Sequence, residues 1–119
     1  MPHLYVDYSD NLAGLPEQQL LTEAVAAVCS HPSIVEELDV KGRIAAVQQY
    51  VVGTVPGPRG FIHAELRLMS GRTPEAKKEL SDRVAEVLRR LTPHPAGMLV
   101  QISVEITDMD RGSYHKSKL

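Results

Sequence analysis

Two residues of this chain, Pro2 and Arg72, have types and positions that suit proton transfer and anion binding. A small residue after Met1 favours removal of the initiator methionine, which would leave Pro2 with a free secondary amine on a rigid ring. An ordinary α-amino group has a pKa of about 8, and burial or a nearby cation lowers that pKa, so that more of the amine is neutral. A neutral amine can act as a general base. Pro2 is therefore a candidate base, and the alternative interpretation is a proline that opens a strand.

Arg72 lies in the turn SGRTPE, residues 70–75, immediately before a predicted helix. Gly71 allows a tight bend there, and the guanidinium of Arg72 offers a planar set of donors that matches a carboxylate. The free N–H groups at the start of the helix add positive potential for an anion. Arg72 is therefore a candidate carboxylate ligand, although an arginine at such a place is often simply solvated.

Four segments have the patterns of β-strands that could position these residues. Residues 3–8 and residues 62–69 alternate between apolar and mostly polar side chains, which gives each strand one face for a core. Residues 41–52 and residues 99–107 are apolar segments that also indicate strands.

Two helical patterns lie between these strands, one beginning near Pro16 and the other near Pro74. Thr73 is a good N-cap, and Pro74 suits the first helical position because its missing N–H leaves no bond unmade there. Apolar residues recur at steps of three and four along one side of each helix, so each helix is expected to cover a sheet. The stripes are Leu20, Leu21, Ala24, Val25 and Val28 in the first helix and Ala76, Leu80, Val84, Val87, Leu88 and Leu91 in the second.

The order strand, helix, strand occurs twice, in residues 2–54 and residues 61–109, with residues 55–60 as the join. A duplicated unit within a single domain explains this order. Each long crossover should make its two strands parallel. We therefore predict an α+β fold with two tandem β-α-β units, a four-stranded sheet and both helices on one face. The other face would need a covering partner, which favours an oligomer.

The composition excludes several classes of protein. Lys and Arg number 13 against 15 Asp and Glu, a net charge of -2, with no sustained run of either sign that would attract nucleic acid or anionic lipid. No apolar run approaches the roughly 18 residues of a transmembrane helix, and no signal peptide is evident. We therefore expect no nucleic-acid or membrane partner and, by default, a cytoplasmic location.

Cysteine and histidine give no sign of further chemistry. The single Cys29 lies in the apolar end of a predicted helix, where a structural role is expected. Five histidines show no close ligand spacing, so we expect no metal site.

Several blocks of the sequence resemble the tautomerase superfamily, whose members use an amino-terminal proline. The opening MPHLYVDYSDN and the block FIHAELRLMSGRT resemble 5-carboxymethyl-2-hydroxymuconate isomerase. In the second half, SGRTPEAKKEL and EITDMDRG are similar to 4-oxalocrotonate tautomerase. The resemblance covers most of the chain.

This resemblance implies an isomerase of aromatic compound catabolism that is a homotrimer and needs no cofactor. Pro2 would move a proton on an unsaturated 2-hydroxy or 2-keto acid that has two or three carboxylates, and Arg72 would bind a carboxylate of that substrate. In the family, a further arginine, from the strand after the first helix, helps to bind the substrate. Here that role falls on Lys41 or Arg43.

The resemblance also implies an aromatic wall beside the proline, for which Tyr50 and Tyr114 are candidates. Two alternatives to the isomerase remain open. One is another chemistry of the superfamily, such as dehalogenation or decarboxylation, in which a carboxylate such as Asp7 or Glu65 would activate water. The other is a catalytically silent trimeric binding module in which retained Met1 blocks the amine.

Overall fold

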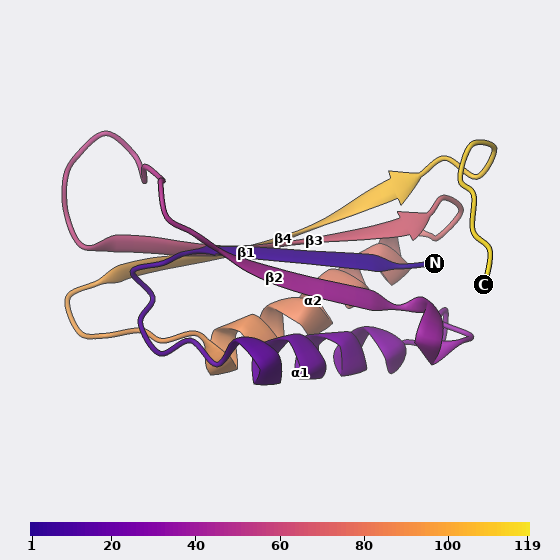
Figure 1. Cartoon of the computed structure of the whole chain (residues 1–119), viewed down its shortest axis with the longest axis horizontal. Helices are drawn as coiled ribbons and strands as arrows, with labels where there is room; N and C mark the ends of the chain where they lie inside the picture. The colour runs from indigo at the N-terminus through magenta and orange to yellow at the C-terminus, as the bar shows by residue number, and fades with distance from the viewer.

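The computed structural model describes residues 1–119 as a four-stranded sheet with two helices packed against one face (Figure 1). The elements are β1 (His3–Ser9), α1 (Glu17–Cys29), the short 3-10 helix η1 (Glu37–Asp39), β2 (Lys41–Val47), β3 (Arg59–Met69), α2 (Pro74–Leu91) and β4 (Leu99–Met109). Neither helix is long and apolar enough to cross a membrane.

The strand order is β2-β1-β3-β4. β1 is parallel to β2 and β3 is parallel to β4, while β1 and β3 are antiparallel neighbours at the centre. These pairings confirm the prediction of two tandem β-α-β units with helices on one face.

The sheet core follows the predicted alternation. Leu4, Val6 and Tyr8 of β1 are buried, and so are the corresponding apolar side chains of β3. The helices cover them with the predicted stripes, whose fully or nearly fully buried members are Leu20, Ala24 and Val28 in α1 and Leu80, Val84, Val87 and Leu88 in α2. Burial of these side chains is the main stabilising contribution to such a fold.

The strand predicted at residues 41–52 is too long, since β2 ends at Val47. β2 is an edge strand that pairs only with β1, and Val47 is opposite Ser9, the last residue of β1. Beyond this pair the chain has no strand partner, and it leaves the sheet as a wide loop (Figure 1).

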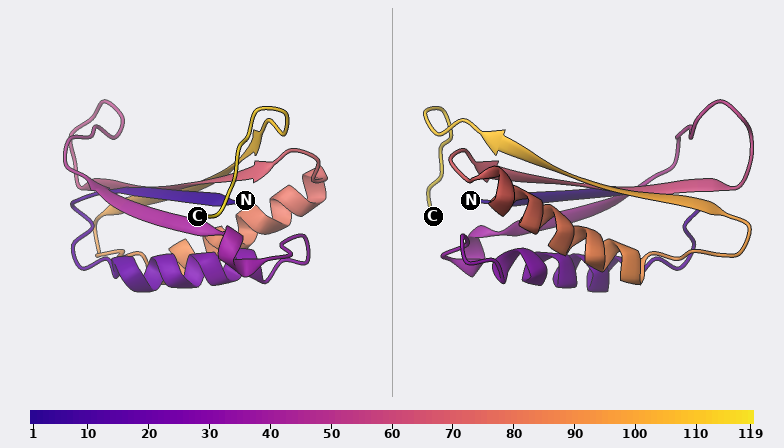
Figure 2. Two further views of the ribbon diagram at one scale, coloured as in Figure 1. Left: turned by 45° about the vertical axis from the view of Figure 1, so that its right-hand side comes forward. Right: turned by 180° about the vertical axis from the view of Figure 1, so that it is seen from behind.

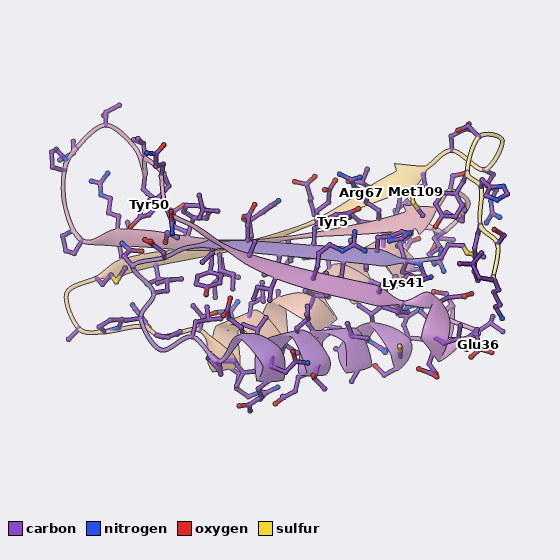
Figure 3. All side chains as sticks on the ribbon, in the orientation of Figure 1. Tyr5, Glu36, Lys41, Tyr50, Arg67 and Met109 are labelled. Carbon is purple, nitrogen blue, oxygen red and sulfur yellow. The ribbon has the colours of Figure 1, made fainter.

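The second face of the sheet carries polar and charged side chains. Tyr5 lies between two guanidinium groups there, with Arg43 at 4.1 Å and Arg67 at 4.6 Å from the ring centroid. Arg67 also forms an ion pair of 3.1 Å with Glu65. Figure 3 shows Tyr5 and Arg67 on this face, away from the helices.

The two termini meet at one end of the sheet. After β4 the C-terminal segment turns back toward the start of β1, whereas the loop after β2 lies at the opposite end (Figures 1 and 2). This arrangement brings the first residues, the last residues and the turn before α2 into one region.

Candidate active site

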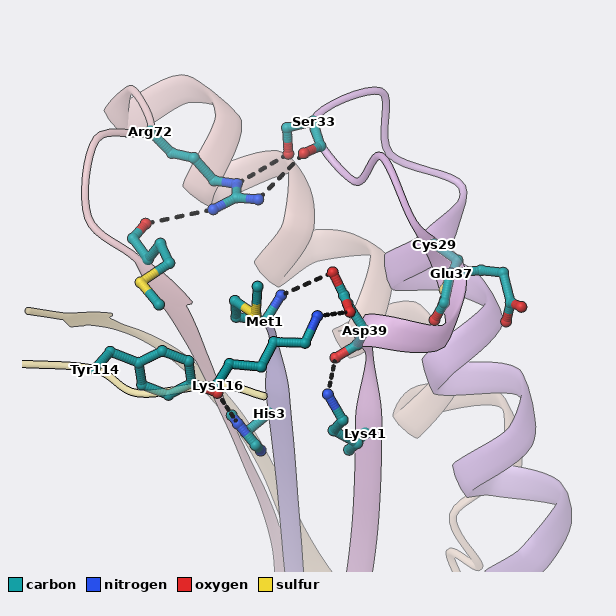
Figure 4. Close-up of polar contacts among 11 residues, drawn as sticks. Met1, His3, Cys29, Ser33, Glu37, Asp39, Lys41, Arg72, Tyr114 and Lys116 are labelled. Carbon is teal, nitrogen blue, oxygen red and sulfur yellow. Dashed lines mark hydrogen bonds and ion pairs between the residues drawn. The ribbon is translucent and has the colours of Figure 1, made fainter. Parts of the chain in front are cut away.

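A cavity of about 280 Å³ lies at the end of the sheet where β1 begins and β3 ends. Four segments meet around it: the amino terminus, the irregular segment between α1 and β2, the turn between β3 and α2, and the segment after β4. Its polar lining consists of Ser33, Glu36, Asp39, Arg72 and Arg111, beside Met1 and Pro2. Figure 4 shows four of these residues, Met1, Ser33, Asp39 and Arg72, with their polar contacts.

The amino terminus is held at this cavity by the sheet. Pro2 is buried, and its carbonyl accepts a hydrogen bond of 3.1 Å from the N–H of Lys41. The α-amino group of Met1 lies 3.7 Å from Oδ2 of Asp39. Lys116, from the C-terminal segment, binds the other oxygen of the same carboxylate (Figure 4).

The surroundings lower the pKa of the α-amino group of Met1. Burial is the largest cause, since a charged amine loses hydration there. Asp39 opposes this effect, while the positive charges of Lys116, Lys41 and Arg72 add to it. The site therefore favours a neutral amine, the form that accepts a proton.

Arg72 is fixed at the cavity by three hydrogen bonds. Its Nε donates to Oγ of Ser33 at 3.0 Å and its Nη2 to the carbonyl of Ser33 at 3.2 Å. Its Nη1 donates to the carbonyl of Met69 at 3.3 Å. Each terminal nitrogen of the guanidinium has one further N–H, and these remain available to a carboxylate.

A second arginine increases the positive charge beside Arg72. Arg111 lines the same cavity, and its Nε donates to the carbonyl of Ser70 at 2.6 Å. Burial and the neighbouring Arg111 both lower the pKa of Arg72, which still carries its charge at any ordinary pH. Two adjacent guanidinium groups suit a substrate with more than one carboxylate.

The predicted site residues do not all reach this cavity. Pro2 and Arg72 both line it. Lys41 lies next to it, with Nζ donating to the carbonyl of Asp39 at 3.0 Å. Arg43 points elsewhere, onto the open face of the sheet, where its Nη2 is 3.0 Å from Nδ1 of His3.

The two tyrosines considered for an aromatic wall lie in different places. Tyr114 is near the amino terminus, with its hydroxyl 2.8 Å from Nε2 of His3. Tyr50 lines a separate, wider cavity of about 570 Å³ under the loop after β2, and it packs edge-on against Phe61. Figure 3 shows Tyr50 at the opposite end of the sheet from Lys41, so Tyr50 cannot wall the Pro2 cavity within one chain.

The carboxylates considered for activating water also lie outside the cavity. Asp7 and Glu65 are on the open face, and Glu65 is bound by Arg67 and by the hydroxyl of Thr107. Both hydrogen bonds lower the pKa of Glu65, that of Arg67 most. The carboxylates that do line the cavity are Glu36 and Asp39.

Five polar or charged residues at the site were missed in the sequence: Ser33, Glu36, Asp39, Arg111 and Lys116. Ser33 and Asp39 lie between the last turn of α1 and the start of β2, where no periodic pattern exists. Arg111 lies in the block EITDMDRG just after β4, and this block was the one available signal.

Cysteine and metal chemistry find no support in the geometry. Burial, and to a lesser extent Glu37, raise the pKa of Cys29, which disfavours a thiolate. The structure brings together no group of three or more His, Cys, Asp or Glu side chains that could hold a metal ion.

Comparisons with known proteins cover nearly the whole chain. A search of curated protein sequences gave no match. A crystal structure of a 5-carboxymethyl-2-hydroxymuconate isomerase from Deinococcus radiodurans R1 superposes with a TM-score of 0.86 at 25% identity, covering 99% of this chain and 90% of that one. A 5-carboxymethyl-2-hydroxymuconate delta-isomerase has a TM-score of 0.73 at 15% identity, with coverages of 100% and 88%. A fused 4-OT in a symmetric trimer also has a TM-score of 0.73, at 16% identity and coverages of 98% and 92%.

The family assignment follows from a family model that matches nearly the whole chain. Residues 2–119 match the model described as 5-carboxymethyl-2-hydroxymuconate isomerase. The match includes Pro2, the turn that holds Arg72 and the segment after β4. This chain belongs to the 5-carboxymethyl-2-hydroxymuconate isomerase family.

Proposed function

We propose that this protein is a cofactor-independent isomerase that moves a proton on an unsaturated 2-hydroxy or 2-keto acid of the 5-carboxymethyl-2-hydroxymuconate type. Pro2 is the general base and acid, once Met1 has been removed. The observation that carries this proposal is the shared cavity: Pro2 and Arg72, distant in the sequence, line one space. The same surroundings lower the pKa of the Met1 α-amino group, and we expect them to act in the same direction on the Pro2 amine.

The proposed reaction needs a base and a stabilised anion. The neutral amine of Pro2 takes the proton of the 2-hydroxyl group of a dienol and returns it to a carbon at the far end of the conjugated system. The amine is then neutral again, and the product is the conjugated ketone. Arg72 binds a carboxylate with its two unused N–H groups and lowers the energy of the dienolate-like transition state.

Two further cations suit the remaining carboxylates of such a substrate. Arg111 lines the cavity, and the ammonium group of Lys41 lies beside it. Arg43 is bound to His3 on the open face and is the weaker candidate. We therefore assign to Lys41 the role that the sequence left open between Lys41 and Arg43.

The proposed active form is a homotrimer. A structural relative, the fused 4-OT, forms a symmetric trimer. In this chain β2 and β4 are edge strands without an outer partner, and the face opposite the helices carries no other element. In such an assembly Tyr50 of one copy could wall the Pro2 cavity of another, which it cannot do within its own chain.

The experiment that tests the proposal follows the ultraviolet absorbance of a 2-hydroxymuconate-type dienol. Pro2→Ala should lose most of the activity, because general base catalysis contributes about 10² to 10⁴ in rate. Arg72→Ala should also lose most of it, because removal of one donor to a developing anion costs about 10² to 10³ in kcat. Equal rates in the wild type and both variants would contradict the proposal. Circular dichroism of each variant controls for loss of the fold.

Removal of Met1 is a condition of this function. The intact mass of the protein purified from its native host shows whether Met1 is present. Retained Met1 in the native protein would exclude a proline base and favour the silent binding module. A cytoplasmic location and a role in aromatic compound catabolism stay predictions.

Hydrolytic chemistry is the second candidate, because the Asp39 carboxylate lies beside the terminal amine and could activate water. Halide release from a haloacrylate, or loss of carbon dioxide from a 3-oxo acid, would identify it. The isomerase proposal expects neither product.

A further inference from the structure

We propose that His31 is a positioning residue for Arg72, acting through Ser33, and that a chain from Glu79 through His31 and Ser33 sets the direction in which Arg72 meets the substrate. This inference deepens the proposed function and rests on its assignment of Arg72 as the carboxylate ligand. His31 itself does not line the cavity.

The chain is continuous in hydrogen bonds. His31 is 4% exposed, just after the end of α1. Its Nε2 lies 3.0 Å from Oε2 of Glu79 on α2. Its Nδ1 lies 3.1 Å from the backbone N–H of Ser33 and 2.9 Å from the hydroxyl oxygen of Ser33. The same hydroxyl and the carbonyl of Ser33 then accept from Arg72, as Figure 4 shows.

The backbone N–H of Ser33 decides which ring nitrogen of His31 carries the proton. An N–H can donate only to a nitrogen that has a free lone pair, so Nδ1 of His31 carries no proton. The proton of the neutral ring is therefore on Nε2, where it is donated to the carboxylate of Glu79. The hydroxyl of Ser33 lies 2.9 Å from the same Nδ1, whose single lone pair faces both the N–H and the hydroxyl, and the hydroxyl oxygen accepts from Nε of Arg72.

The consequence concerns a segment that has no regular structure of its own. Ser33 lies between α1 and η1, outside any helix or strand, so no backbone ladder holds it. His31 ties Ser33 to α2, the helix that starts directly after Arg72. Ser33 and Arg72, the two partners of this contact, are therefore both anchored to α2.

The first test compares His31→Leu with His31→Asn. Leucine keeps the burial but removes the acceptor, so Ser33 loses both bonds, and KM should rise about 10- to 100-fold with a smaller change in kcat. The amide oxygen of asparagine can replace Nδ1, so His31→Asn should recover a large part of the loss. Equal KM values for wild type and His31→Leu would overturn the proposal.

Arg83→Ala is the matched control. Arg83 also ties α2 to the segment after α1, since its Nη1 donates to Oγ of Ser30 at 2.8 Å, but it does not contact Ser33. Arg83→Ala should lose a similar structural tie and keep the wild-type KM. A rise in KM equal to that of His31→Leu would show a general effect of loosening the segment and would overturn the positioning role.

A double-mutant cycle separates positioning from stability. If His31 acts through Arg72, then His31→Leu should lower kcat/KM in the wild type but not in an Arg72→Ala background. The same loss in both backgrounds would overturn the proposal. A wild-type kcat/KM for Arg72→Ala alone would instead show that the proposed function is wrong.

Nuclear magnetic resonance tests the positioning role of His31 without an activity assay. The ring nitrogens of His31 should show the neutral form protonated on Nε2, and Nε–H of Arg72 should give a separate, slowly exchanging signal. That signal should be lost in His31→Leu and in Ser33→Ala, and kept in Arg83→Ala. A ring protonated on Nδ1, or an unchanged Arg72 signal in the variants that fold, would overturn the inference.

Discussion

The charge around the amino terminus is set by two residues that meet only in the folded chain, Asp39 and Lys116. Asp39 raises the pKa of the terminal amine and Lys116 lowers it, and the two side chains bind each other. Lys116 also lowers the pKa of Asp39, mainly through its hydrogen bond to the carboxylate. The amine therefore sits beside a carboxylate whose negative charge is largely compensated.

We expect the Pro2 amine of the processed protein to respond to Asp39 and Lys116 in the same direction as the Met1 amine does. Replacement of Lys116 by methionine should then raise the pKa of the terminal amine, because the charge of Asp39 is uncompensated. Asp39→Asn should lower it. Since only the neutral amine accepts a proton, the acid side of the pH–rate profile should move to higher pH in Lys116→Met and to lower pH in Asp39→Asn.

The matched control for this charge change is Lys118→Met, which removes the same charge from an exposed residue of the same segment. Its pH–rate profile should coincide with that of the wild type. Movement of the Lys116→Met profile to lower pH would contradict the assigned sign.

Lys41 and Arg43 provide a direct test of the substrate side. Lys41→Ala should raise KM about 2- to 5-fold, the range of a partly exposed ion pair, because its ammonium group lies beside the cavity. Arg43→Ala should leave KM unchanged, since Arg43 binds His3 and stacks on Tyr5. Steady-state kinetics with one dicarboxylate substrate measure both KM values. A raised KM in Arg43→Ala alone would show that Arg43, and not Lys41, binds the substrate.

At the scale of elements, the packing of α1 on β2 depends on one glycine. A Cβ atom on Gly42 would lie 2.8 Å from Cγ2 of Val25 and 2.9 Å from Cδ1 of Leu21. Real Cβ atoms do not approach other heavy atoms so closely, so the side chains of Val25 and Leu21 would have to shift in the contact between α1 and the sheet. The same helix leads into the segment that carries His31 and Ser33.

Gly42→Ala should therefore lower the free energy of unfolding by roughly 1 to 3 kcal/mol, the usual cost of overpacking. Urea denaturation followed by circular dichroism measures this change. Gly112→Ala is the control, since its Cβ would meet nothing closer than 3.6 Å. Identical denaturation midpoints for the two variants would contradict the close packing of α1 and β2.

At the scale of the whole molecule, three of the six exposed large apolar side chains lie at the end of the sheet away from the Pro2 cavity. Val51 is 85% exposed and Val55 is 61% exposed in the loop after β2, and Leu99 at the start of β4 is 54% exposed. The backbone of Leu99 is bonded to Pro58 at the end of that loop. Such a group of apolar side chains suits a contact between copies of the chain.

Light scattering of the purified protein should give the mass of three chains. If the loop after β2 lies in the interface of the trimer, Val51→Asp places a charge in that buried contact. The mass of the particle should then fall. Ala26→Asp, on the exposed side of α1, should leave the mass unchanged. A wild-type mass of one chain would contradict the homotrimer.

The sequence by itself determined the elements, their faces and the two main candidates for chemistry. Alternation in β1 and β3, the stripes of α1 and α2 and the cap at Thr73 depend on neighbours within a few residues. Thr73 indeed accepts from the N–H of Ala76 at 3.1 Å. The same local signals set the turn before Arg72, and the family resemblance added the role of Pro2.

Only the tertiary structure decided which other side chains share the cavity with Pro2. Ser33 and Asp39 come from an irregular segment, and Arg111 and Lys116 come from the segment after the last strand. Their meeting depends on the antiparallel pairing of β1 with β3 and on the return of the C-terminal segment, which no local pattern encodes. Long-range packing likewise ended β2 at Val47, because an edge strand extends only as far as its partner strand. It also gave different contacts to Lys41 and Arg43, two residues of the same strand: Lys41 donates to the carbonyl of Asp39, and Arg43 lies against His3.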